Sequence, residues 1–312
     1  MELTARTKLS LSIPPPFDFA LTVKKPAGWS WSTPKETFED GMLATGVRFG
    51  DDPVGLIMRE KDGRVRVDAY TASPLTPPAR GDLEDFLLQG LGADEDLAGF
   101  YAFAQDDPVL RQATADLTGM RIGQLDDAFA GVILAILLQM APIARSEKMM
   151  DDVLEQFGTR IAFGGNQLII WPKAGEIAAT GPEALRKKAK LGYRADRLVK
   201  AAQYLEEHPV SLRNLVAVPE EEAIKTIMAI PGIGRYSAAI IFGQATPPID
   251  AWSVVIMSEL YGGRTPENSR KEIDRVQKDL IARWGRWSYL AFAYIVNDLD
   301  RIRKNHPLTR TR

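Results

Sequence analysis

Residues 227–263 decide the fold, and they read "IMAIPGIGRYSAAIIFGQATPPIDAWSVVIMSELYGG". A helix begins just before them at Pro219, which three glutamates follow, because proline is tolerated in a first turn and acids complement the helix dipole. Pro231 and Gly232 end this helix, and a second helix begins at Arg235. The pattern therefore predicts two helices joined by a tight Pro-Gly-x-Gly turn.

The two glycines of this turn indicate what the resulting helix-hairpin-helix could bind. Gly232 and Gly234 can take conformations closed to other residues and let a phosphate approach the backbone. The N–H groups that start the second helix point outward, with the positive end of its dipole. A DNA backbone could be held in this way without any base being read. A plain αα-hairpin that ends in a glycine stop is the alternative.

Asp250 stands directly before the next helix, which begins at Ala251. An aspartate in this position is usually an N-cap, because its side chain accepts hydrogen bonds from the first free N–H groups of the helix. The preceding Ile249, two prolines and the neighbouring Trp252 would, however, partly desolvate the carboxylate. Both interpretations stay open at this point, a helix cap and a carboxylate with a chemical role.

Composition limits the chemistry. The 312 residues predict roughly two domains, and 45% hydrophobic with 26% charged residues are typical of a globular protein. There is no cysteine, and the only histidines are His208 and His306, far apart in the sequence. Thiolate catalysis, iron–sulfur clusters and Cys/His zinc sites therefore lack ligands. We expect neither a metal nor a cofactor.

The N-terminal stretch has no apolar signal region, and no uncharged apolar run is long enough to cross a bilayer. These features predict an intracellular protein of the cytoplasm or nucleoid, with no membrane partner. The formal net charge is −2. Any positive surface for a nucleic acid must therefore be local.

The chain changes character near residue 80. Before it, short β-rich runs separated by turn signals predict a small antiparallel sheet; after it, the apolar period becomes helical. We therefore predict an α+β protein with an N-terminal antiparallel β domain over 1–80 and a helical domain over 81–312. The segment 126–158 reads as one helical run, and 160–178 is ambiguous. The predicted strands are 8–13, 17–23, 46–50, 54–60 and 64–71.

The turn and the aspartate together resemble a known family. Ile-Pro-Gly-Ile-Gly-Arg-Tyr-Ser-Ala, followed by Pro-Ile-Asp at the head of the next helix, is similar to the helix-hairpin-helix glycine/proline/aspartate superfamily of DNA glycosylases. The most similar branch holds 3-methyladenine DNA glycosylase II and the 8-oxoguanine glycosylases. The resemblance implies that Gly232, Ile233, Gly234 and Arg235 grip the DNA backbone. It also implies that Asp250 drives cleavage of the N-glycosidic bond of a flipped base.

Other segments extend the resemblance over nearly the whole chain. Residues 126–146 are similar to the helix that enters the DNA in this branch, which implies that Gln139 and Met140 form a minor-groove wedge and that Arg145 meets a phosphate. Residues 191–202 and the small β domain also look like the family. Met140 has an alternative interpretation as ordinary core, because it continues an apolar stripe.

Departures from the family pattern narrow the expected reaction. Bifunctional members carry a Schiff-base lysine two residues after the second hairpin glycine, where this chain has Tyr236, so we expect monofunctional hydrolysis. The cysteine loop of cluster-bearing members is missing. The segment between Gly234 and Asp250 is shorter than in the family, although Asp250 is the only acidic residue between Glu222 and Glu259.

Alkylated purines such as 3-methyladenine and 7-methylguanine are cationic, so aromatic side chains would attract them by cation–π interaction. Tyr236 and Trp252 are the candidates for a base pocket; further aromatic candidates are Phe17, Phe19 and Tyr294. Basic side chains at positions 186, 190, 194 and 197 either meet phosphates or form a solvated helix face.

The sequence thus predicts a monomeric, monofunctional DNA N-glycosylase that acts on alkylated purines in damaged double-stranded DNA. A glycosylase for 8-oxoguanine or another damaged base is one alternative. A hairpin module that binds DNA without catalysis is the other.

Overall fold

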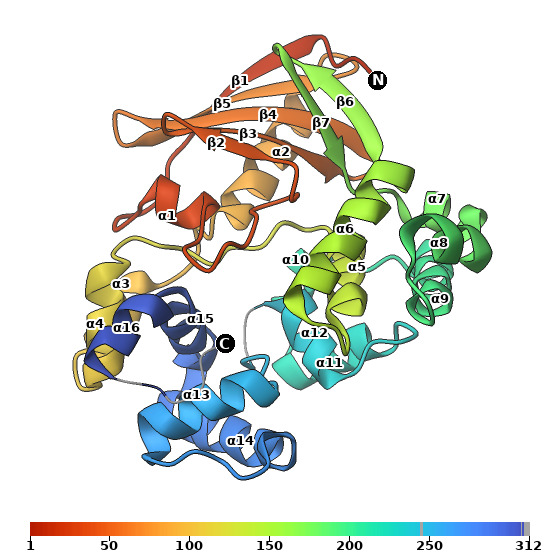
Figure 1. Ribbon diagram of the computed structural model, residues 1–312. Helices are drawn as coiled ribbons and strands as arrows, with labels where there is room; N and C mark the ends of the chain where they lie inside the picture. The colour runs from red at the N-terminus through yellow and green to blue at the C-terminus, as the bar shows by residue number, and fades with distance from the viewer. Residues whose placement is uncertain (244–245, 307, 309–312) are drawn as a thin grey trace.

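A five-stranded antiparallel sheet occupies the N-terminal region of the computed structural model, which describes residues 1–243, 246–306 and 308 (Figure 1). The spatial order of the strands is β1-β5-β4-β3-β2. Tight turns connect β2 to β3, β3 to β4 and β4 to β5, whereas helix α1 (Phe19–Val23) lies between β1 and β2; between β4 and β5, Asp62 and Gly63 both take positive φ, as a two-residue hairpin turn requires. The prediction of an α+β protein with an antiparallel N-terminal sheet is confirmed. The strands are β1 (Ala5–Leu11), β2 (Thr37–Glu39), β3 (Met42–Phe49), β4 (Asp52–Lys61) and β5 (Arg64–Thr71).

One predicted strand is wrong. Residues 17–23 form the short helix α1 (Phe19–Val23), because Asp18 caps it: its Oδ1 accepts the N–H of Leu21 at 2.8 Å. A local side-chain bond of this kind competes with strand pairing. The three-residue strand β2 was not predicted, since it is too short to show an alternating pattern.

Helices make up most of the remaining chain (Figure 1). Most begin at an Asp, Pro or Ser near a residue that the sequence indicates as a start. Their bounds are α2 (Pro77–Gly90), α3 (Leu97–Ala104), α4 (Pro108–Asp116), α5 (Ala128–Leu138), α6 (Ile143–Phe157), α7 (Ala174–Thr180), α8 (Pro182–Ala189), α9 (Arg194–Glu207), α10 (Leu212–Leu215), α11 (Glu220–Met228), α12 (Arg235–Phe242), α13 (Ala251–Gly262), the 3-10 helix η1 (Ser269–Glu272), α14 (Ile273–Trp284), η2 (Gly285–Trp287), α15 (Ser288–Asn297) and α16 (Leu299–Asn305).

The run 126–158 is two helices rather than one. Helix α5 ends at Leu138 and α6 begins at Ile143, so a four-residue turn separates them. Pro142 explains the break, because proline has no N–H to donate and excludes the residue before it from helical conformation. The turn carries Gln139 and Met140, two of the predicted DNA-binding residues.

The ambiguous segment 160–178 contains a hairpin of β6 (Thr159–Phe163) and β7 (Asn166–Ile170), followed by α7. This hairpin lies against the sheet (Figure 1). It approaches so closely that a Cβ at Gly55 would meet the Phe163 ring at 2.3 Å, and one at Gly46 would meet Ile170 at 2.5 Å. A part of the chain after residue 80 therefore packs on the sheet. The division into domains at residue 80 stays a prediction.

Two separate apolar cores hold the helices after α2, whereas α1 and α2 pack on the core of the sheet. One core joins α5–α12, and the other joins α3 and α4 with α13–α16. Phe242 belongs to the first core and Ile249 to the second, so Asp250 enters at their junction. Within residues 1–243, 246–306 and 308, no helix combines the length and apolar character that a membrane span requires.

Candidate active site and DNA interface

The hairpin between α11 and α12 has the predicted form, but its two glycines differ. Gly232 has φ +85°, and a Cβ there would lie 3.2 Å from Cβ of Arg197, so both conformation and space favour glycine. Gly234 has φ −99° and ψ 178°, with nothing within 4 Å of a Cβ. Of these two glycines, Gly232 takes a conformation closed to other residues and Gly234 does not.

The start of α12 presents free N–H groups. Gly234 is its N-cap without a side-chain cap, and the first helical bond runs from Ala238 N–H to the carbonyl of Gly234 at 2.8 Å. In the described part of the chain, the N–H groups of residues 234–237 meet no acceptor. An anion can therefore bind there, assisted by the helix dipole.

The other two hairpin residues are already engaged. Ile233 is buried in the first helical core, and its N–H donates to the carbonyl of Ile230 at 3.1 Å. The guanidinium of Arg235 forms an exposed ion pair with Glu221, with Nη2 3.0 Å from Oε2. The Ile233 side chain would therefore support the hairpin from within the core and would not touch DNA. Arg235 would have to exchange Glu221 for a phosphate in order to contact DNA.

Met140 lies at the tip of the turn between α5 and α6, and 82% of it is exposed. The alternative interpretation of Met140 as core is therefore wrong. Its φ is +50°, which is uncommon for a residue other than glycine. Ile143, one residue after Pro142, is also exposed. The turn presents apolar side chains to solvent, as a wedge residue requires.

Gln139 does not point into solvent, although it stands next to Met140. Its Nε2 donates to the carbonyl of Gly232 at 2.9 Å and lies 3.3 Å from Oγ of Ser237. Its Oε1 accepts from Nη1 of Arg197 at 2.5 Å, and its backbone carbonyl accepts from Arg194. The side chain predicted to contact DNA is thus bonded within the protein.

Two further basic candidates, Arg145 and Arg186, already have partners within the protein. Arg145 donates to the carbonyl of Lys190 at 2.8 Å, which brings the start of α6 to the end of α8. Arg186 pairs with Glu183 and Asp196, so it belongs to a self-paired helix face. The structure places Arg145 near the wedge turn and leaves its contact with a phosphate a prediction.

Asp250 is the N-cap of α13, and its carboxylate is held on one side. Oδ1 accepts from the N–H groups of Trp252 at 3.1 Å and Ser253 at 2.8 Å, and from Oγ of Ser253 at 2.7 Å. Among the residues that the structure describes, no hydrogen bond engages Oδ2. The capping role is thus present, and one carboxylate oxygen is left for other chemistry.

The two aromatic residues predicted for a base pocket are both partly exposed. Tyr236 is 37% exposed and Trp252 is 41% exposed. Burial and then the charge of Asp250 raise the pKa of Tyr236, so the phenol stays protonated and the two groups lie within electrostatic reach. The other aromatic candidates lie elsewhere. Phe19 is in the sheet core, and Tyr294 is fully buried, with its hydroxyl donating to the carbonyl of Met120 at 2.5 Å.

Phe17, the last of these aromatic candidates, is partly buried and packs against the core of the sheet.

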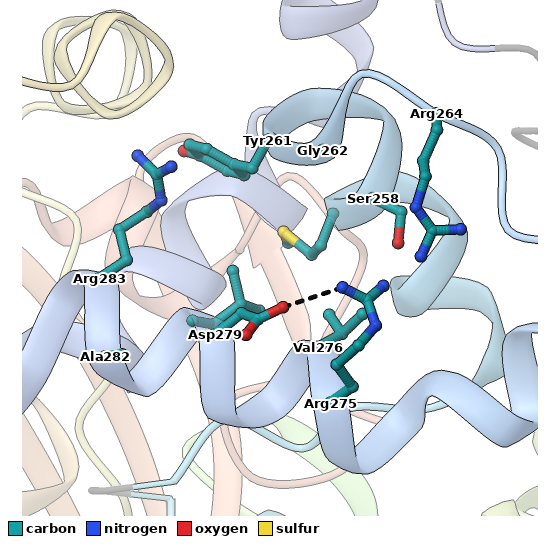
Figure 2. A pocket seen from close by; sticks show the side chains of 11 residues that line it. Ser258, Tyr261, Gly262, Arg264, Arg275, Val276, Asp279, Ala282 and Arg283 are labelled. Atoms are coloured by element: carbon teal, nitrogen blue, oxygen red, sulfur yellow. Dashed lines mark hydrogen bonds and ion pairs between the residues drawn. The ribbon is translucent and has the colours of Figure 1, made fainter.

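A cavity of about 510 Å³ lies between α13 and α14 (Figure 2). Its rim carries arginines that already have partners: Nη1 of Arg275 lies 3.0 Å from Oδ2 of Asp279, and Arg283 covers the ring of Tyr261 at 4.7 Å. Asp250 does not line it. This cavity is therefore not the predicted base pocket.

Sequence reasoning missed two residues of the site. Ser253 completes a capping box with Asp250, and its position three residues after a capping aspartate is a readable signal. Tyr193 is exposed, and the guanidinium carbons of Arg194 and Arg197 lie 4.6 and 4.8 Å from its ring centre. The spacing within α9 did not indicate this stack.

Two curated proteins are similar in sequence, and no family model matches. A DNA-3-methyladenine glycosylase of Bacillus subtilis (strain 168) is 21% identical over 227 residues, which are 71% of this chain and 74% of that protein. DNA-3-methyladenine glycosylase 2 of Escherichia coli (strain K12) is 26% identical over 179 residues, which are 57% of this chain and 60% of that protein.

Solved structures share the fold over most of the chain. MBOgg1 in complex with a low-affinity DNA ligand has a TM-score of 0.74 at 20% identity, covering 95% of this chain and 96% of that one. A 3-methyladenine DNA-glycosylase from Archaeoglobus fulgidus has a TM-score of 0.72 at 21% identity, covering 95% and 98%. An 8-oxoguanine glycosylase/lyase of Clostridium acetobutylicum, in complex with DNA, has a TM-score of 0.70 at 15% identity, covering 91% and 92%. The predicted resemblance to the helix-hairpin-helix DNA glycosylases is therefore confirmed: both sequence relatives bear the name of a DNA-3-methyladenine glycosylase, and the solved structures with this fold include 3-methyladenine and 8-oxoguanine glycosylases.

Proposed function

We propose that the protein is a monofunctional DNA N-glycosylase of base excision repair, which hydrolyses the glycosidic bond of alkylated purines flipped out of double-stranded DNA. Asp250 is the catalytic carboxylate in this proposal. The names of the sequence relatives support the choice of 3-methyladenine-type lesions. An intracellular location and a monomeric state remain predictions that accompany it.

The observation that carries the proposal is the way in which α13 holds Asp250. One oxygen is fixed by three hydrogen bonds from the first turn, and the other has none in the described residues. Glycosidic cleavage develops positive charge on the sugar, which a carboxylate held in advance stabilises without reorganisation. Oδ2, the oxygen without a described hydrogen bond, could also orient the attacking water.

The neighbouring aromatic residues support a cationic base as substrate. Tyr236 and Trp252 are partly exposed; the charge of Asp250 reaches Tyr236, and the backbone N–H of Trp252 donates to Asp250 Oδ1 at 3.1 Å. An electron-rich ring attracts an N-alkylated purine, which carries a positive charge that an undamaged purine lacks. Tyr236 also occupies the position of the family's Schiff-base lysine, which supports hydrolysis without strand cleavage.

The hairpin and the wedge turn supply the remaining functions. The free N–H groups at residues 234–237 are suited to a DNA phosphate. Met140 projects from its turn and would fill the space that an extruded base leaves. Extrusion costs a few kcal/mol and is easiest for damaged pairs, which adds selectivity.

Single-turnover strand scission tests the proposal. Duplex oligonucleotides carrying 7-methylguanine, hypoxanthine, 8-oxoguanine or uracil are incubated with the wild type and with Asp250→Asn, with and without hot alkali. We expect scission of the 7-methylguanine duplex only after alkali, and its loss in the variant. Asparagine also caps helices well, so the fold should persist. Asp96→Asn is the matched control, because Asp96 caps α3 in the same manner.

An 8-oxoguanine glycosylase is the second candidate, because solved structures with this fold include one of that activity. Alkali-dependent scission of the 8-oxoguanine duplex alone would favour it. Scission without alkali would contradict the argument from Tyr236. If no duplex is cut, Asp250 serves only as the cap that the structure shows, and the protein is a DNA-binding module.

A further inference from the structure

The side chain of Gln139 joins three segments that are far apart in the sequence. It comes from the turn between α5 and α6, donates to the hairpin at Gly232, and accepts from Arg197 on α9. Both ends of its amide are therefore occupied within the protein. A glutamine used in this way holds backbone segments together and has no donor left for a base.

Arg197 completes this contact from the other side. Its Cβ, Cγ and Cδ would lie 3.2, 3.3 and 3.4 Å from a Cβ at Gly232, so its aliphatic stem packs on the hairpin backbone. Its guanidinium reaches Oε1 of Gln139 and stacks on Tyr193. One side chain thus contacts both the phosphate-binding hairpin and the residue before the wedge.

Met140 follows directly in the chain, and its backbone is unusual. Its φ of +50° costs free energy for a residue with a side chain, so neighbouring contacts must hold it. Its own side chain, 82% exposed, supplies few such contacts. Gln139, the preceding residue, is held by the amide bonds above and, at its backbone carbonyl, by Arg194 and by the hydroxyl of Tyr193 at 3.4 Å. These bonds orient the backbone that leads into Met140.

We propose that Arg197, acting through Gln139, is a positioning residue that fixes Met140 relative to the DNA-binding hairpin during base extrusion. This inference rests on the proposed function, because it assigns a part in flipping the damaged base. Two consequences follow. Loss of either partner should slow extrusion of a paired base, and it should matter little when the base is already unpaired.

A direct phosphate contact by Arg197 is the competing explanation, since the residue is exposed. The two differ in three measurable ways. A phosphate contact would lower the salt dependence of DNA binding when removed, by a slope of roughly one. It would also affect paired and unpaired lesions alike, and it would act independently of Gln139.

The test measures extrusion without cleavage. In an Asp250→Asn background, 2-aminopurine fluorescence beside 7-methylguanine reports flipping by stopped flow, in a full duplex and in a single-nucleotide bulge that leaves the lesion unpaired. Variants are Arg197→Ala, Gln139→Ala and the double change. Lys200→Ala is the matched control, since it removes a positive charge from the exposed face of α9 three residues away. Thermal melting checks that each variant folds.

We expect Arg197→Ala and Gln139→Ala each to slow extrusion about tenfold in the duplex and less than about threefold in the bulge. The double variant should be no slower than the slower single one, because both act through one contact. Lys200→Ala should behave as the parent.

Equal slowing in duplex and bulge, additive effects in the double variant, or a reduced salt slope in Arg197→Ala would each overturn the positioning role. Absence of any extrusion signal in the Asp250→Asn parent would overturn it as well. Extrusion by that parent, without cleavage of any lesion by the wild type, would instead refute the proposed glycosylase and leave the positioning role standing.

Discussion

Ser253 donates both its N–H and its hydroxyl to a single oxygen of Asp250, at 2.8 and 2.7 Å. In return, Oγ of Ser253 accepts the N–H of Asp250 at 2.8 Å. These bonds fix the orientation of the Asp250 carboxylate relative to the first turn of α13, so its side chain cannot rotate freely. A feature that makes a good helix cap also fixes the direction of Oδ2, so the structural and chemical interpretations of Asp250 are compatible.

Removal of the Ser253 hydroxyl should therefore lower catalysis without abolishing it. Ser253→Ala keeps the backbone bond and loses the hydroxyl bond to a charged oxygen, which is worth about 1.5 kcal/mol, or roughly tenfold in rate. Single-turnover excision of the preferred lesion is the measurement. Ser258→Ala is the control, because Ser258 lies on the same helix and its buried Oγ has no hydrogen-bond partner among the residues that the structure describes. Equal losses in the two variants would contradict the role of the Ser253 hydroxyl.

The hairpin glycines should respond differently to substitution. Gly232→Ala forces a side chain into positive φ beside Arg197, so we expect a loss of about 1–3 kcal/mol in the free energy of unfolding. Gly234→Ala should cost less than about 1 kcal/mol, because its φ is ordinary and its surroundings are open, which leaves only the lower preference of alanine for the N-cap position. Urea denaturation of both variants is the measurement. Similar losses would show that conformation does not decide the use of glycine here.

Local signals made much of the fold and site readable from the sequence. The hairpin follows from Pro231 and Gly232, and the placement of Asp250 follows from the helix after it, since each depends on neighbouring residues alone. The strand expected over 17–23 failed because one capping bond from Asp18 outweighed the β-rich composition. Pro142 was also a local signal, for the break between α5 and α6, but the continuous apolar pattern on both sides of it suggested a single helix.

The contacts of Gln139 show what the sequence could not supply. Its partners Arg197 and Gly232 lie 58 and 93 residues away along the chain, and neither position carries a pattern that points to the other. The hairpin β6–β7 is a similar case, because only the close packing of Phe163 on Gly55 explains why the sheet needs glycine there. Pairings of this kind come from the tertiary fold.

Met140→Gly should separate stability from function. Glycine accepts φ +50° without strain, while it raises the entropy of the unfolded chain, so we expect the free energy of unfolding to change by no more than about 1 kcal/mol. The apolar side chain would be lost, and excision from a paired duplex should fall at least about tenfold. Melting curves and single-turnover rates check both parts. A large stability loss with normal excision would place Met140 in a structural role.

Glu95 should make stability depend on pH. It lies in the loop before α3, and the N–H of Ile122 donates to its Oε1 at 2.9 Å. Burial raises the pKa of Glu95 to about 7, although the bond from Ile122 and the charges of Arg121 and Lys25 oppose this shift. The folded chain therefore holds this proton more tightly than the unfolded chain, in which the pKa is near the ordinary 4.5.

Between about pH 4.5 and pH 7, the unfolded chain has released the Glu95 proton and the folded chain retains it, so the free energy of unfolding should fall as pH rises through this window. Glu95→Gln keeps an acceptor for Ile122 and has no proton to lose, so its stability relative to the wild type should rise from pH 5 to pH 8. Urea denaturation at both pH values measures this difference. Glu207→Gln, an exposed position on α9, should show no such change. An identical pH dependence in wild type and Glu95→Gln would mean that Glu95 ionises in the folded protein as easily as in the unfolded chain.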